Sequence, residues 1–209
     1  MAPFGLSALR SLLGRGDNNT PWQPPEASWS RRFGLGWESP YTVRYASNLD
    51  DGPDHGMPLG GFGAGCLGRS PSGAFNLWNL DGGEHWFGSI PDCQFALWEQ
   101  QGEAVRAHAL ATAPDRDDTD PSGGTPLSAW QWYPASTQGR STGTYAARYP
   151  LSWTHHEDVY RAGVLCEAFS PILPGDYQRT SYPVAVFRWQ FSNPTDQPLE
   201  LSLMLCWRN

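Results

Sequence analysis

The strongest constraint on the fold of this chain is an alternation of apolar and polar residues near its C-terminal end. From residue 199 to residue 207 every odd position holds Leu or Trp, and the even positions hold Glu, Ser, Met and Cys. Residues 184–191 alternate in a similar way. Successive side chains of a strand point to opposite faces of its sheet, whereas a helix repeats every 3.6 residues. Both runs therefore predict strands with one apolar face.

The segment between these two runs, NPTDQP at residues 193–198, is typical of a turn. We therefore expect residues 184–208 to form a hairpin. The side chains expected to face the core are Phe187, Trp189, Leu201, Leu203 and Leu205.

The composition extends this expectation to the whole chain. Gly contributes 23 and Pro 19 of the 209 residues, and only 17% are charged, which argues against a coiled coil, a helical bundle or a charged disordered chain. Further strand-like runs cover residues 41–46, 75–80, 93–99, 103–109, 127–133, 144–159 and 160–169, with a hairpin signal at 100–102. The predicted fold is an all-β, antiparallel β-sandwich with no helix beyond the N-terminal leader.

The expected domain organisation is a disordered leader at residues 1–30, marked at its end by prolines, followed by one β domain at 31–209. An open alternative is that this domain is truncated at its C-terminal end. No apolar run is long enough for a membrane span, and the leader lacks the charged start of a signal peptide. The four cysteines form no CxxC pair, so we expect free thiols in a reducing compartment and a cytoplasmic location.

The charge balance excludes several function classes. All 14 basic residues are Arg, and the net charge is -7, which is a poor match for nucleic acid because phosphate contacts dominate that affinity. The absence of Lys removes Schiff-base and P-loop chemistry. We expect no cofactor and no metal, since no ligand spacing is present.

One glycine motif, GAGCLG at residues 63–68, fits the GxGxxG pattern of dinucleotide sites. That fingerprint must be followed by a helix, and Pro71 and Gly73 disfavour a helix here. We therefore interpret the glycines as a bend between strands, where positive φ and close backbone approach are needed.

The densest polar cluster beside aromatic residues contains Asp81, Glu84 and His85. It is interpreted first as a turn, and alternatively as the lining of a ligand or interdomain cleft. Several tryptophans present a similar choice between core packing and stacking on sugar rings. They are Trp78, Trp86, Trp98, Trp130 and Trp132.

Several strings, in order along the chain, resemble the N-terminal part of glycoside hydrolase family 116. They are GMPLGGFGAG (56–65), FNLW (75–78), DGG (81–83), YAARYP (145–150), CEAFSP (166–171), TSYPVAVF (180–187), NPT (193–195) and LMLCWRN (203–209). The family includes bacterial β-glucosidases and the non-lysosomal glucosylceramidase, also called bile acid β-glucosidase.

The resemblance implies an N-terminal β-sandwich that packs on a larger (α/α)6 barrel in cis. The barrel of such enzymes carries the catalytic Glu and Asp of a retaining mechanism. No catalytic or substrate-binding residue can be assigned to this chain, and the chain alone is expected to be inactive. Substrates implied by the resemblance are β-glucosides or glucosylceramide.

Two alternatives remain at this stage, a free-standing carbohydrate-binding sandwich and a purely structural interaction domain. We also expect self-association of the isolated chain, because its last strand is its most apolar one and becomes an unpaired edge if the next strand lies beyond residue 209.

Overall fold

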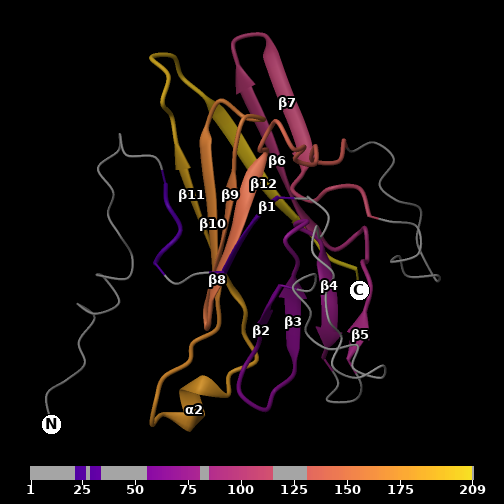
Figure 1. Ribbon diagram of the computed structural model, residues 1–209, viewed down its shortest axis with the longest axis vertical. Helices are drawn as coiled ribbons and strands as arrows, with labels where there is room; N and C mark the ends of the chain where they lie inside the picture. Colours follow the sequence, from indigo (N-terminus) through magenta and orange to yellow (C-terminus); the bar gives the residue numbers. More distant parts are fainter. Residues whose placement is uncertain (1–21, 27–28, 34–55, 81–84, 115–130, 209) are drawn as a thin grey trace, which may run out of the picture.

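The computed structural model describes residues 22–26, 29–33, 56–80, 85–114 and 131–208. In this part of the chain the strands form three antiparallel sheets, accompanied by one short helix (Figure 1). The predicted all-β, sandwich-like class is confirmed. The predicted strand at 41–46, most of the one at 127–133 and most of the leader lie outside the described residues.

The largest sheet has five strands in the order β1-β8-β9-β10-β11. They are β1 (Trp29–Arg32), β8 (Gly143–Arg148), β9 (Leu151–His156), β10 (Gly163–Phe169) and β11 (Val186–Ser192). The register places Cys166 of β10 between Thr154 of β9 and Trp189 of β11, so these side chains share the face that turns to the core. The single strand-like run predicted at 144–159 is thus two strands, separated by a turn after β8.

The second sheet has three strands in the order β12-β6-β7. They are β12 (Glu200–Cys206), β6 (Gln94–Gln101) and β7 (Ala104–Ala109). The predicted hairpin between β6 and β7 is confirmed, since Gln101 pairs with Ala104 and Gly102 takes a φ of +59° in the turn. A positive φ is readily reached only by glycine, which explains this residue at the tip.

The third sheet has four strands in the order β2-β3-β4-β5. They are β2 (Met57–Leu59), β3 (Cys66–Arg69), β4 (Phe75–Asn79) and β5 (Trp86–Phe87). The short helix α2 (Tyr177–Thr180) was not predicted. It is one turn, begun by the Asp176 carboxylate, which accepts a hydrogen bond from the Arg179 N–H at 3.0 Å, and a single turn leaves no periodic pattern to detect.

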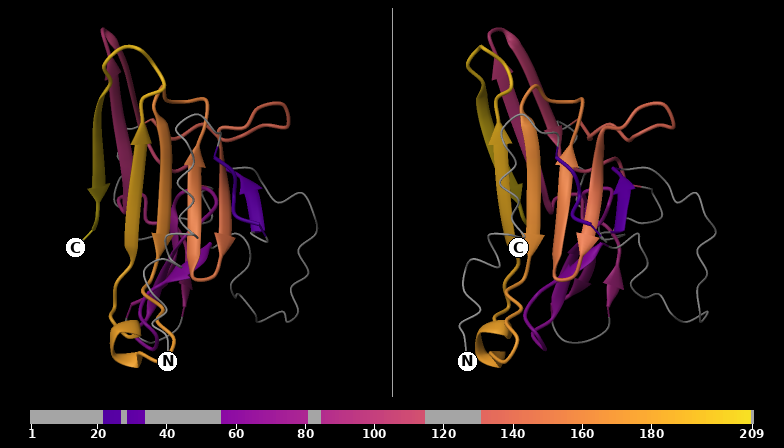
Figure 2. Two further views of the ribbon diagram at one scale, coloured as in Figure 1. Left: turned by 90° about the vertical axis from the view of Figure 1, so that its left-hand side faces the viewer. Right: turned by 60° about the vertical axis from the view of Figure 1, so that its left-hand side comes forward.

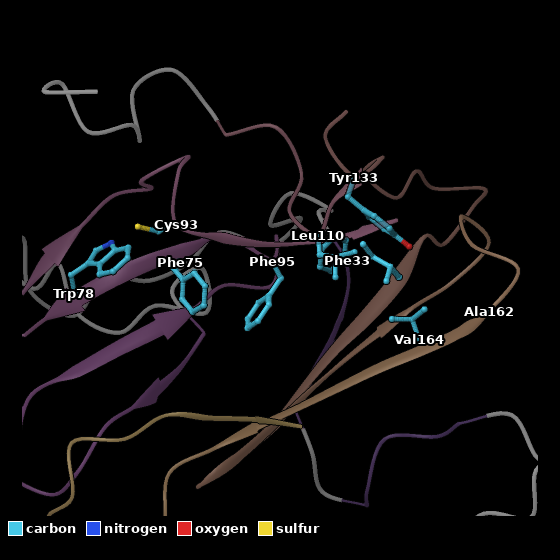
Figure 3. Close-up of a cluster of buried hydrophobic side chains, with 10 residues drawn as sticks. Phe33, Phe75, Trp78, Cys93, Phe95, Leu110, Tyr133, Ala162 and Val164 are labelled. Carbon is cyan, nitrogen blue, oxygen red and sulfur yellow. The ribbon is translucent and has the colours of Figure 1, made fainter. Parts of the chain in front are cut away.

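The main core lies where the three sheets meet. Phe75 comes from the four-stranded sheet, Phe95 from the three-stranded sheet and Val164 from the five-stranded sheet (Figure 3). In the left view of Figure 2 the long strands β8–β11 stand next to one another in one layer, and β6, β7 and β12 form a second layer behind them. The buried members of the cluster are Phe33, Phe75, Trp78, Cys93, Phe95, Leu97, Leu110, Tyr133, Ala162 and Val164.

The predicted hairpin over residues 184–208 is wrong. β11 pairs with β10 and β12 pairs with β6, so the two strands lie in different sheets. The turn between them does form, with Thr195 N–H donating to the Asn193 side chain at 2.9 Å, but it carries the chain across from one sheet to the other. Alternation along each strand is local, whereas the choice of a pairing partner depends on the rest of the sheet.

The predicted inward-facing residues are confirmed in part. Phe187, Trp189 and Leu201 pack against the main core. In contrast, Leu203 is 38% exposed and Leu205 51% exposed. Leu203 and Leu205 are both in β12, which is an edge strand of its sheet among the described residues, so their side chains have a neighbouring strand on one side only.

Candidate interaction surface

One end of the molecule is built on the glycine-rich loop between β2 and β3, residues 60–65 (Figure 1). A Cβ at Gly60 would lie 2.1 Å from the Gly65 carbonyl oxygen, and one at Gly61 would lie 2.3 Å from the Tyr182 carbonyl oxygen. Side chains are therefore excluded where this loop contacts itself and the neighbouring segment. The interpretation of the motif at 63–68 as a bend between strands is confirmed for Gly63 and Gly65, whose φ values are +74° and +81°. Gly68 lies within β3, the strand that stands where a dinucleotide site requires a helix.

The neighbouring segment, residues 170–184, contains α2 and is tied to the glycine-rich loop by hydrogen bonds. Phe62 N–H donates to the Thr180 carbonyl at 2.8 Å, and Gly60 N–H donates to the Ser170 hydroxyl at 2.6 Å. The buried Thr180 hydroxyl bonds both backbone groups of Leu173. The two segments thus form one rigid support.

Large apolar side chains nevertheless point outward from this support. Phe62 is 66% exposed and Tyr177 is 75% exposed. We call this region the glycine-rich end; its exposed apolar members are Phe62, Leu80, Trp86, Tyr177, Tyr182 and Val184. Exposed aromatic side chains on a rigid backbone are typical of surfaces that contact a partner, because little conformational entropy is lost on binding.

The predicted polar cluster falls at this end only in part. His85 is exposed, with its Nε2 3.3 Å from the Asn79 side-chain nitrogen and 3.9 Å from the Cys66 sulfur. Its ring stacks on that of Phe87. Asp81 and Glu84 lie outside the described residues, so their geometry relative to His85 is not part of the site described here.

The predicted aromatic candidates divide between the core and the surface. Trp78 is buried and donates from its indole N–H to the Gly88 carbonyl at 2.8 Å, while its neighbour Trp86 is exposed. Trp98 is half-buried and lines a pocket of about 260 Å³ on the outer face of β6, β7 and β12. Trp132 is half-buried, and Trp130 lies outside the described residues. Among the described candidates, Trp86 is exposed and Trp98 borders this pocket, so both are placed to contact a ligand ring.

The remaining chemistry of the described residues is sparse. Among them, no group of three or more His, Cys, Asp or Glu side chains is arranged to hold a metal ion. None of the four cysteines is in a disulfide, and burial raises the pKa of Cys166 to about 12, which makes it a poor nucleophile. Within the described residues no helix is long and apolar enough to cross a membrane.

Sequence reasoning missed the second half of the glycine-rich end. Tyr177 and Tyr182 were not singled out, because nothing in the sequence shows that residues 170–184 contact the loop at 60–65, more than 100 positions earlier. The exclusion of a Cβ at Gly61 marks this contact, but it is visible only in the structure.

A comparison with protein families provides the remaining finding. The family described as "beta-glucosidase 2, glycosyl-hydrolase family 116 N-term" matches residues 56–209. The match begins just before β2 and covers every described strand except β1.

Proposed function

The chain belongs to glycoside hydrolase family 116, and we propose that it is the N-terminal, non-catalytic domain of a retaining β-glucosidase or glucosylceramidase. The observation that carries this proposal is the family match over residues 56–209. Its description supports β-glucosides as the substrate class and a catalytic domain in the same polypeptide. The resemblance assigns the two catalytic carboxylates to an (α/α)6 barrel, where they are held about 5 to 5.5 Å apart.

Within this proposal, the work of the domain is to support the barrel and to shape the mouth of its cleft. The glycine-rich end is the surface best suited to this contact, because its aromatic side chains are exposed on a hydrogen-bonded backbone. The chain also approaches this region after β12, where the Trp207 ring contacts those of Phe75 and Trp78 in the four-stranded sheet. The whole of residues 31–209 is proposed to act as one domain.

Activity measurements on aryl β-glucosides test the proposal. The 209-residue chain is expected to show no turnover, and the product of the full reading frame that encodes it is expected to hydrolyse them. Turnover by the 209-residue chain that disappears in Asp81→Asn or Glu84→Gln would place the active site in this domain and overturn the proposal.

Variants of the full-length product test the role of the glycine-rich end. Phe62→Asp and Tyr177→Asp are expected to lower both activity and thermal stability when they are introduced into that product. Val105→Asp, on the exposed outer face of β7, is the matched control and is expected to have little effect. Equal effects of all three variants would contradict contact at the glycine-rich end.

A second candidate is a free-standing carbohydrate-binding role, favoured by the Trp98 pocket and by exposed Trp86. Flat aromatic rings stack well on the C–H faces of sugars. Affinity of the isolated chain for soluble β-glucans, lost in Trp98→Ala or Trp86→Ala, would favour this role over the first.

The cellular location and the behaviour of the isolated chain belong to the same proposal. The four cysteines form no disulfide with one another, which supports a reducing compartment, and we place the protein in the cytoplasm. The apolar last strand supports self-association of the isolated 209-residue chain. Cell fractionation tests the first statement, with recovery in the membrane or secreted fraction as the contrary result.

A further inference from the structure

A cleft of about 480 Å³ lies between the strand β7 and the loops that precede β8 and β10. Figure 1 shows the β6–β7 hairpin and the β9–β10 turn at the end of the molecule opposite α2, so the cleft lies away from the glycine-rich end. Its volume is within the range of small-molecule sites, which is about 300 to 1,000 Å³. The described residues that line it are Val105, Arg106, Ala107, His108, Gln131, Pro134, Arg140, Asp158 and Val159.

The walls of the cleft are held in place by backbone pairing. Along its whole length β7 pairs with β6, and the Ala109 N–H donates to the Gln131 carbonyl at 2.9 Å. The loop before β8 contains a tight turn in which the Thr137 N–H donates to the Arg140 carbonyl at 2.8 Å. The Arg140 guanidinium donates to the Asp158 carbonyl at 2.8 Å and so joins the two loops. These contacts are within the domain, so they set the walls of the cleft whatever polypeptide precedes or follows it.

Asp158, at the border of the cleft, has an unusual backbone conformation. Its φ is +57°, the one positive value for a residue other than glycine among the described residues. Such conformations are uncommon outside glycine, and they cluster at functional sites, including those that hold ligands. Glycine would adopt this conformation without strain, whereas Asp158 also brings a carboxylate to the border of the cleft.

Two arginines supply positive charge to the cleft. The Arg106 side chain is 35% exposed, and its ion pair with Glu99 uses the Nη1 nitrogen. Arg140 is exposed, and its contact with the Asp158 carbonyl uses one Nη2 donor. A guanidinium has five N–H donors, so both arginines keep donors for a ligand. Guanidinium groups bind carboxylates and other oxyanions, preferably through two parallel hydrogen bonds.

The other polar groups of the lining suit hydroxyl groups. Burial lowers the pKa of His108, so its ring is neutral at neutral pH. Its Nδ1 lies 3.3 Å from the Trp132 carbonyl, which can only accept, so Nδ1 is the donor and Nε2 is an acceptor. The Asp158 carboxylate and the Gln131 amide add further acceptors. Two cations beside several acceptors match a ligand that carries both a carboxylate and hydroxyl groups.

We propose that this cleft is a binding site for a sugar acid, a small ligand with one carboxylate and several hydroxyl groups. Arg106 and Arg140 bind the carboxylate, and Asp158, His108 and Gln131 bind the hydroxyl groups. A neutral sugar would leave the arginines without an anion, and an inorganic anion such as sulfate would leave the acceptors without donors. The site goes beyond the proposed function and does not depend on it, because every group it uses belongs to this domain.

Calorimetric titration of the 209-residue chain with D-glucuronate tests the proposal. We expect saturable binding that weakens as sodium chloride is added, because salt screens the attraction between the arginines and the carboxylate. D-glucose, which lacks the carboxylate, and sulfate, which lacks the hydroxyl groups, are each expected to bind at least about tenfold more weakly.

Two variants test the roles of the arginines. Arg140→Gln and Arg106→Gln are each expected to weaken glucuronate binding about tenfold, because each removes a charged donor for the carboxylate. Arg148→Gln is the matched control and is expected to leave binding unchanged, since Arg148 is equally exposed but does not line the cleft. Thermal unfolding of each variant separates loss of the site from loss of the fold.

Three results would overturn the proposal. They are heats of titration that never saturate with glucuronate, equal affinities for glucuronate and for glucose or sulfate, and binding that Arg148→Gln weakens as much as Arg140→Gln and Arg106→Gln do. None of these results bears on β-glucoside hydrolysis, so failure of the sugar-acid site is distinguishable from failure of the proposed function.

Discussion

Two buried charges join the sheets of this protein, and they are accommodated in opposite ways. Arg69 of β3 is only 4% exposed, and Glu99 of β6 only 1% exposed. Arg69 reaches the Thr154 hydroxyl in the five-stranded sheet, and Glu99 reaches the turn that leads into that sheet. An ion transferred from water into a protein interior loses several kcal/mol of solvation, which its new contacts must offset, so the comparison shows how each charge is compensated.

The Arg69 guanidinium is compensated by neutral groups. It donates to the carbonyls of Gly73 and Leu110 at 2.9 and 2.8 Å and to the Thr154 hydroxyl at 3.2 Å. It also lies over the rings of Phe95 and Trp189, with its central carbon 5.7 and 5.6 Å from their centroids. Burial lowers the pKa of Arg69 from its ordinary value, but a guanidinium remains charged.

The Glu99 carboxylate is compensated by direct donors. It accepts hydrogen bonds from the backbone N–H groups of Arg161 and Ala162, at 2.8 to 3.0 Å, and it forms an ion pair with Arg106 at 2.9 Å. These backbone groups immediately precede β10, so Glu99 fixes the turn that leads into the five-stranded sheet. The Arg69 cation thus depends on neutral acceptors and rings from several separate segments. The Glu99 carboxylate depends on two adjacent backbone N–H groups and one arginine.

Removal of the buried cation is expected to have the largest effect. Arg69→Met leaves the Gly73 and Leu110 carbonyls without these donors inside the core, and we expect a loss of about 3 to 5 kcal/mol in the free energy of unfolding. Urea denaturation measures it. Arg148→Met, which changes an exposed arginine, is the matched control and should cost less than about 0.5 kcal/mol. A small loss for Arg69→Met would mean that the cation is not needed to join the sheets.

Neutralising the anion is expected to cost less. Glu99→Gln keeps the shape and one acceptor oxygen but replaces the other oxygen with an NH2 group that faces a backbone N–H, and we expect a loss of about 2 kcal/mol. Urea denaturation again applies. A loss equal to that of Arg69→Met would contradict the difference drawn between the two charges.

His156, whose imidazole lies near Arg69, allows the effect of burial to be tested by the pH dependence of stability. His156 is fully buried among the rings of Phe33, Tyr133 and Trp189. Burial, and then the charge of Arg69, hold the pKa of His156 well below its ordinary 6.5. The unfolded chain therefore binds a proton below pH 6.5 that the folded chain does not.

Stability is expected to fall as the pH falls below 6.5, by about 1.4 kcal/mol per unit from this one group, until the folded-state pKa is reached. His156→Phe fits an aromatic environment and is expected to remove that part of the slope, whereas His85→Gln, at an exposed ring, is expected to keep it. Thermal unfolding between pH 7 and pH 5 makes the comparison. An unchanged slope in His156→Phe would show that other groups cause it.

The smallest effect on stability is expected at Arg106, the partly exposed partner of the buried Glu99 carboxylate. The Arg106 side chain is 35% exposed, so solvent screens its ion pair with Glu99. Arg106→Met is expected to cost less than about 1 kcal/mol in urea denaturation, well below Glu99→Gln. A larger loss would indicate that the ion pair, and not the backbone N–H groups, compensates the buried carboxylate.

Local features of the fold were accessible from the sequence. The strands β4, β7, β10 and β12 fall within runs recognised from their residues, and β6 and β11 extend two residues and one residue beyond theirs. The turn after Gln101 follows from Gly102. The family was accessible as well, because its strings lie in order along the chain and the later match covers residues 56–209. Strands and family motifs could both be recognised from the sequence because each is a pattern among neighbouring residues.

The candidate surface was accessible only in part. Gly63 and Gly65 were recognised as part of a bend, but the contact of Gly61 with residues 181 and 182 was not. Leu205 shows the same limit within a strand: its face is set by alternation, while its exposure depends on β12 being the edge of its sheet.

What the sequence alone determined is therefore the position of most of the longer strands, their apolar faces and the family. The tertiary structure decided that β11 and β12 belong to different sheets, that Arg69 and Glu99 are buried between segments distant in the chain, and that Phe62 and Tyr182 share one end. The physical reason is distance along the chain. Strand periodicity arises between residues two positions apart. A buried charge and its partner, such as Arg69 and the Thr154 hydroxyl, meet across 85 positions, where no local pattern specifies the pair.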